Sequence, residues 1–83
     1  MLEYYDVLDN LKILYEKKNA DYGDSFNKLL DEFGLISSTI KLQDKVNRLK
    51  IIIKNKDQKV MDESIEDTLM DIANYSIMTL MRL

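Results

Sequence analysis

Apolar side chains recur every three or four residues along most of this 83-residue chain, which is the spacing of one face of an α-helix. The pattern predicts four helices, over residues 2–18, about 25–33, 37 to about 54 and 62 to about 82. Strand-like alternation, internal repeats and low-complexity tracts are absent from the sequence. We therefore expect a single all-α domain over residues 1–83, a helical bundle of three long helices and one short helix.

The predicted breaks between helices depend on few residues, because the chain has no proline and only two glycines. Residues 17–24 interrupt the first apolar pattern with Asn, Asp and Gly, which tolerate turn geometry. Gly34 should end the short helix, and Ser37 or Ser38 should cap the third helix. Residues 55–59 form a polar connector to the last helix.

The size of the chain favours self-association. A domain this short buries only about 60–65% of the surface of its unfolded chain and is often marginally stable alone. Apolar residues make up 46% of the sequence, and no cysteine is present to form a stabilising disulfide. We therefore expect oligomerisation to complete the core, as a homodimer or a homotetramer.

The missing residue types restrict the chemistry of any site. Without cysteine or histidine, the chain has no thiol nucleophile and no imidazole base, and a metal would have to be held by oxygen atoms, as Mg²⁺ and Mn²⁺ are. No apolar run approaches the roughly 18 residues needed to cross a bilayer, and the first residues do not resemble a signal sequence. We expect a cytoplasmic protein with no membrane partner.

Charge is divided unevenly between the last two predicted helices. Residues 41–59 carry seven Lys or Arg against two acids, whereas residues 62–83 carry five acids against Arg82. The net charge of -3 gives no reason to expect direct binding to nucleic acid. The two segments could pack as neighbours with solvated charged rims, or they could enclose a charged ligand.

The last predicted helix carries acids on a segment that is otherwise apolar on nearly all sides. At about 100° per residue, Glu63, Asp67, Asp71 and Asn74 share one face of this helix, and the helix is expected to be covered on both faces. Carboxylates inside a helical assembly indicate a cation, a basic partner or both. For the acids of the first turns, including Glu66, the alternative is a favourable interaction with the helix dipole.

The third predicted helix carries the complementary cations. Phosphate-transfer sites without histidine commonly combine carboxylates from two helices, which hold Mg²⁺, with Lys or Arg beside the phosphate oxygens. Here Asp44 lies between Lys41, Lys45 and Arg48, so two antiparallel helices could hold a triphosphate between them. The alternative is an ordinary surface, with Asp44 and Arg48 as an ion pair and both lysines in solvent.

Three separated segments carry a recognisable pattern, namely residues 18–23 (KNADYG), 44–49 (DKVNRL) and 62–75 (DESIEDTLMDIANY). In this order they resemble the nucleotide-modification-associated domain family of short bacteriophage and bacterial proteins, and the resemblance covers most of the chain from about residue 17. This family looks related to the all-α nucleoside triphosphate pyrophosphohydrolases of the MazG and dimeric dUTPase type. The resemblance implies a bundle completed by oligomerisation, nucleotide ligands and Mg²⁺ or Mn²⁺.

The chain departs from the pyrophosphohydrolase pattern, in which Glu-x-x-Glu and a later Glu-x-x-Asp supply four carboxylates. In the first motif, Asp44 is the one acid where two are expected. In the second, Asp71 fits the final Asp, but Thr68 stands three residues before it; Asp67 could substitute for the missing acid, and Glu63 could add a ligand one turn further back. Nucleotide binding is therefore more strongly indicated than hydrolysis.

The sequence suggests three sets of site residues and three functions. The candidate catalytic residues are Asp44, Asp67 and Asp71, and the candidate metal ligands are Asp44, Glu63, Glu66, Asp67 and Asp71. The candidate nucleotide-binding residues are Lys18, Asp21, Tyr22, Lys41, Lys45, Arg48, Asn74 and Tyr75. The functions are a Mg²⁺-dependent nucleoside triphosphate pyrophosphohydrolase, an oligomer that binds or sequesters a nucleotide, such as a signalling nucleotide in phage–host conflict, and a helical interaction module.

Overall fold

The computed structural model describes residues 1–22, 24–55 and 58–83, with the side chains of these except at residues 20–22 and 58–63. The helices are α1 (Tyr4–Tyr22), α2 (Ser25–Phe33), α3 (Leu35–Lys54) and α4 (Gln58–Leu80). No strand occurs in the part of the chain that is described. The prediction of an all-α fold with three long helices and one short helix is confirmed.

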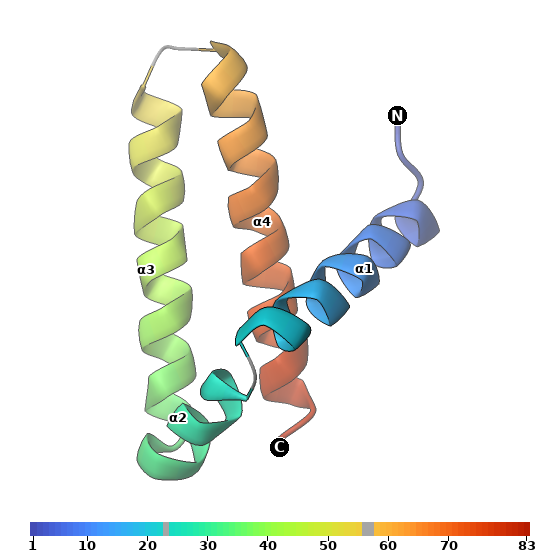
Figure 1. Ribbon diagram of the computed structural model, residues 1–83. Coiled ribbons are helices and arrows are strands. Elements are labelled where there is room, and N and C mark those ends of the chain that lie inside the picture. The colour runs from blue at the N-terminus through green and yellow to red at the C-terminus, as the bar shows by residue number, and fades with distance from the viewer. Residues whose placement is uncertain (23, 56–57) are drawn as a thin grey trace.

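The helices α3 and α4 form a long antiparallel hairpin, with α2 at its lower end and α1 crossing α4 (Figure 1). Ser38 Oγ lies 2.9 Å from Thr79 Oγ1. Seven residues further along α3, Lys45 contacts Asp71, which precedes Thr79 by eight residues. The basic and acidic segments are therefore neighbours, as a shared site between them requires. The first half of α1 projects away from the hairpin, and no other helix lies beside it (Figure 1).

The helix α1 continues to Tyr22, so the turn predicted from residue 17 is wrong at its start. Lys18 contacts Asp71 on α4, and Asn19 donates a hydrogen bond to Tyr15 one turn earlier. The contact between Asn19 and Tyr15 joins side chains one helical turn apart, so it accompanies a helical backbone past residue 18.

The junction between α2 and α3 consists of Gly34 alone. Gly34 ends α2, as predicted, with φ 75° and ψ −163°. The helix α3 begins at Leu35, so the prediction that a serine caps it two or three residues later is wrong. The Ser37 hydroxyl instead donates a 2.9 Å hydrogen bond to the carbonyl oxygen of Gly34. The last helix also begins earlier than predicted, at Gln58.

A single copy of the chain leaves much of its apolar surface uncovered. The buried apolar side chains among the described residues are Leu11, Phe26 and Leu30. On α4, Leu69 remains 48% exposed, so the expectation that both faces of this helix are covered is wrong within one copy. None of the helices in the described part is long and apolar enough to span a membrane.

Candidate functional site

The carboxylate of Asp71 joins three helices. One of its oxygens accepts a hydrogen bond from Lys18 Nζ on α1, and the other lies 3.1 Å from Lys45 Nζ on α3. The side chain of Asp71 is 14% exposed, that of Lys45 is 23% exposed and that of Lys18 is 46% exposed. Two positive charges against one negative charge leave a net charge of +1 at this point.

The lysines determine the protonation state of Asp71. Burial by itself raises the pKa of this carboxyl, but hydrogen bonds and Coulomb attraction from Lys18 and Lys45 outweigh burial, so the pKa of Asp71 lies below its ordinary value. Asp71 is therefore ionised at neutral pH and holds both ammonium groups in place. We call these three residues the Asp71 cluster.

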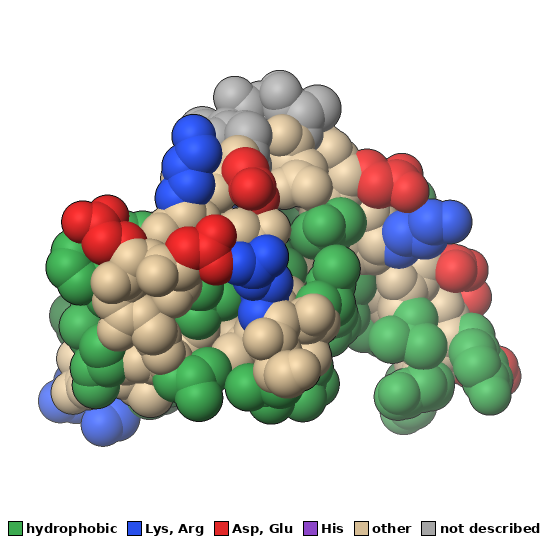
Figure 2. All heavy atoms as spheres, turned by 90° about the horizontal axis from the view of Figure 1, so that it is seen from below, with side chains coloured by type: hydrophobic (Ala, Val, Ile, Leu, Met, Phe, Trp, Pro, Cys, Tyr) green, Lys and Arg blue, Asp and Glu red, His purple; other side chains and the backbone are tan. Residues whose placement is uncertain are grey.

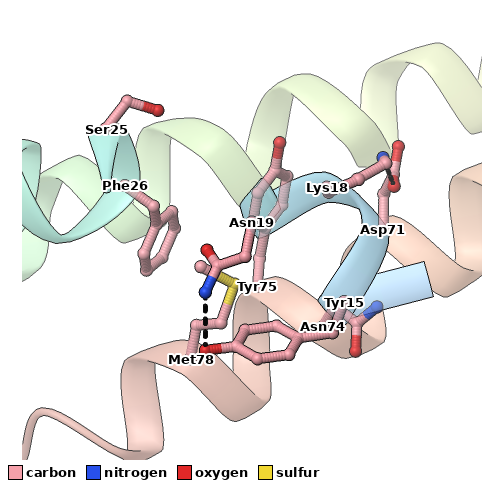
Figure 3. A pocket seen from close by; sticks show the side chains of 9 residues that line it. All are labelled: Tyr15, Lys18, Asn19, Ser25, Phe26, Asp71, Asn74, Tyr75 and Met78. Atoms are coloured by element: carbon pink, nitrogen blue, oxygen red, sulfur yellow. Dashed lines mark hydrogen bonds and ion pairs between the residues drawn. The ribbon is translucent and has the colours of Figure 1, made fainter. Parts of the chain in front are cut away.

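A hollow of about 180 Å³ opens beside the Asp71 cluster, between the end of α1, the start of α2 and the middle of α4 (Figure 3). It is lined by Tyr15, Lys18, Asn19, Ser25, Phe26, Asp71, Asn74, Tyr75 and Met78. Lys18 and Asp71 lie at one end of the hollow and Phe26 lies at the other (Figure 3). We call this space the nucleotide hollow, after the ligand class that the family resemblance of the sequence implies.

The nucleotide hollow has aromatic walls with polar groups between them. The rings of Phe26 and Tyr75 are stacked, with centroids 5.3 Å apart and an interplanar angle of 6°. Asn19 Nδ2 donates a 3.2 Å hydrogen bond to the hydroxyl of Tyr15 (Figure 3). Flat rings beside amide and hydroxyl groups suit a planar heteroaromatic ligand, which can stack and form hydrogen bonds at its edge.

Asn74 holds the wall of the nucleotide hollow together. It is 8% exposed, and its Nδ2 donates a 3.3 Å hydrogen bond to the carbonyl oxygen of Leu11 on α1. This bond fixes α1 against α4, and with it the position of Lys18. The amide of Asn74 therefore serves the packing of the two helices as well as lining the hollow.

The structure brings together part of the predicted site. The Asp71 cluster and the nucleotide hollow contain Lys18, Lys45, Asp71, Asn74 and Tyr75. Asp44, Arg48, Glu66 and Asp67 are exposed, and Lys41 is half-buried. Asp21, Tyr22 and Glu63 lie outside the described side chains.

The predicted acids do not gather around a common point. Among the residues described, no group of three or more acids could hold a metal ion. The geometry of α3 explains why Asp44 is not part of a cluster with Asp71. Adjacent helical residues point about 100° apart, so when Lys45 faces α4, Asp44 is turned away.

Five side chains of the nucleotide hollow were not predicted as site residues, namely Tyr15, Asn19, Ser25, Phe26 and Met78. Tyr15 and Phe26 recur at helical spacing with other apolar residues, such as Leu8 and Leu11 or Leu29 and Leu30, so a core position is the simplest interpretation from sequence. The spacing of Tyr15 and Asn19 was a usable signal, because side chains four residues apart face each other on a helix. That signal required α1 to continue past residue 18.

A protein-family comparison gives the chain a relationship. The model of the family described as nucleotide modification associated domain 1 matches residues 18–83. The chain belongs to this family. The matched segment of the chain starts at Lys18, which belongs to the Asp71 cluster, and includes α2, α3 and α4. Comparisons with curated proteins and with solved structures found no match. The relationship to MazG-like pyrophosphohydrolases is not part of the family match and stays a prediction.

Proposed function

We propose that this protein binds a nucleotide, with the base in the nucleotide hollow and a phosphate group at Lys18 and Lys45. The observation that carries the proposal is the Asp71 cluster, in which Lys18, which lines an aromatic hollow, and Lys45 from another helix are held by one carboxylate. Membership of a family associated with nucleotide modification supports the same ligand class.

The two lysines are suited to a phosphate because their positions are already fixed. Asp71 orders both side chains in the folded protein, so less conformational entropy is lost when an anion binds to them. The net charge of +1 attracts an anion, and each ammonium group keeps donors for phosphate oxygens. Lys41 and Arg48 lie one turn on either side of Lys45, so further phosphates can extend along α3.

The size of the nucleotide hollow limits what enters it. Pockets that enclose ligands of drug size measure about 300–1,000 Å³, whereas this hollow measures about 180 Å³. It therefore accommodates a planar base, with the sugar and the phosphates at its rim. Lys18 lies at that rim, so the position of the charge agrees with the expected position of the phosphates (Figure 3).

Mg²⁺-dependent cleavage of a nucleoside triphosphate to monophosphate and pyrophosphate is the second candidate function. Its support is an ionised carboxylate, Asp71, beside the proposed phosphate position. The described residues do not fit a metal site, however, because Asp44, Glu66 and Asp67 are exposed and two ammonium groups already occupy Asp71. Positive charges at hydrogen-bond distance from the carboxylate disfavour a further cation there. The geometry therefore favours a protein that holds a nucleotide without consuming it.

Calorimetric titration with nucleoside mono-, di- and triphosphates, with and without Mg²⁺, tests the proposal. We expect binding, recovery of unaltered ligand after denaturation, and at least tenfold weaker binding in Lys45→Gln, because one charged hydrogen bond contributes about 1.5–3 kcal/mol. Lys50→Gln removes an exposed charge from the same helix and should bind normally. Pyrophosphate release that is lost in Asp71→Asn would favour the hydrolase, and absence of binding across the panel would favour an interaction module.

A further inference from the structure

A second hollow, of about 270 Å³, lies between α1 and the C-terminal part of α4. Its walls include Leu8 and Leu11 on one side and Ile77 and Met81 on the other, and Lys12 is the charged residue among those that line it. Figure 2 shows apolar side chains on both sides of the recess between α1 and the rest of the molecule. We call this feature the α1–α4 groove.

The exposed surface area of the chain gives the area that a binding partner would have to bury. The chain exposes 6614 Å² at a mass of 9.8 kDa. A folded monomer of this mass exposes roughly 5,200 Å², so the excess is roughly 1,400 Å². Obligate homodimers bury roughly 1,000–2,500 Å² per subunit. A second copy of the chain therefore matches the uncovered area.

The first half of α1, residues 4–10, is complementary to the α1–α4 groove. This segment, which we call the α1 arm, extends away from the hairpin (Figure 1). Tyr4 and Tyr5 at its start are 72% and 75% exposed, which is costly for two aromatic side chains. The arm carries Asp6 and Asp9, and the groove carries Lys12. Aromatic contacts and opposite charges thus favour an arm from one copy in the groove of another.

We infer that two copies of this chain exchange their α1 arms, each arm lying in the α1–α4 groove of the other copy. The arrangement is self-complementary, because each copy supplies one arm and one groove, as a two-fold dimer requires. Tyr15 and Asn74 line both the groove and the nucleotide hollow. The second copy therefore also supports a wall of the ligand site, a step that rests on the nucleotide binding proposed above.

Cross-linking tests the exchange directly, because the chain has no cysteine of its own. Tyr5→Cys and Met81→Cys chains are co-expressed, treated with a bismaleimide and analysed by mass spectrometry. We expect an abundant cross-link between position 5 of one copy and position 81 of the other. Ile51→Cys replaces Tyr5→Cys as the control, since Ile51 is 69% exposed on α3. Equal cross-linking in the control, or none in either sample, overturns the arm exchange.

Sedimentation velocity separates this inference from the proposed function. We expect a dimer for the unaltered chain and for Ile51→Asp, but a monomer for Ile77→Asp, with nucleotide affinity reduced at least tenfold in the monomer. Circular dichroism establishes whether Ile77→Asp remains helical. If this variant unfolds, the cross-linking experiment alone tests the arm exchange. A monomeric unaltered chain that binds nucleotide overturns the arm exchange alone. A cross-linked dimer that binds no nucleotide overturns the proposed function and leaves the exchange standing.

Discussion

Replacement of Asp71 by asparagine tests where the phosphate binds. Asparagine has nearly the shape of aspartate but no charge, so Lys18 and Lys45 lose their ionic partner while the packing of α4 is kept. In the proposed site, Asp71 competes with the phosphate for the two ammonium groups. Removing its charge should therefore tighten nucleotide binding, although it removes two ion pairs, because the amide oxygen of asparagine can still accept a hydrogen bond from a lysine and keep part of its order.

The expected gain follows from the geometry of the Asp71 cluster. A phosphate that contacts both lysines lies close to the carboxylate between them, and two unit charges about 4 Å apart interact by about 4 kcal/mol near a protein surface. Lys18 is 46% exposed, so water and salt screen much of this repulsion. We expect about 1 kcal/mol to remain, which corresponds to about fivefold in Kd.

Calorimetric titration with a nucleoside diphosphate at low ionic strength measures this gain. Asp71→Asn should bind about fivefold more tightly than the unaltered protein, and the difference should shrink in about 1 M salt. Glu32→Gln, an exposed position on α2, makes the same change in net charge and should leave the affinity unchanged. Weaker binding by Asp71→Asn would refute the reasoning, because it would mean that ordering of the lysines by the carboxylate, or its contact with the ligand or a metal ion, outweighs the repulsion.

Three further predictions concern stability. Because the folded-state pKa of Asp71 is lowered, its ionised form stabilises the protein above about pH 4, and this contribution is lost as the pH falls through the folded-state pKa. Urea unfolding at pH 6 and pH 3 should therefore differ less in Asp71→Asn, and an equal difference would contradict this. Gly34→Ala should cost about 1–3 kcal/mol, because φ 75° and ψ −163° suit glycine alone. An unchanged Tm would show that the junction relaxes. Asn74→Ala should lower the free energy of unfolding by about 1 kcal/mol, because the hydrogen bond to Leu11 is lost. Amide hydrogen exchange should then become faster in α1 than in the unaltered protein, with a smaller change in α3. A uniform increase in exchange would refute that role.

Helical periodicity was sufficient to predict the fold class and most of each helix. It succeeded because apolar residues keep a helical spacing along one face of each helix, even where that face is exposed in a single copy of the chain. Gly34 was predictable as a helix end because the positive φ at this junction requires glycine. The extension of α1 was not predictable, because the Asn and Asp after residue 18 are typical of turns, and the contact of Lys18 with Asp71 joins residues 53 positions apart in the sequence.

The candidate site was only partly accessible to the same reasoning. The sequence identified the lysine-bearing ridge of α3 and the acids of α4, but the rotation of α3 decides that Lys45 rather than Asp44 faces Asp71. The aromatic wall was missed because Tyr15 and Phe26 look like core residues on their own helices. Periodicity also cannot distinguish a covered apolar face from an exposed one, as Leu69, 48% exposed on α4, illustrates.

The most direct test of nucleotide binding in this hollow is a ¹H–¹⁵N NMR titration of the unaltered protein with a nucleoside triphosphate. The account predicts that chemical shift changes concentrate at the end of α1 and the middle of α4, with Asn19 and Asn74 among the residues affected most. Changes confined to the α2–α3 junction around Gly34, or no changes at millimolar ligand, would contradict it.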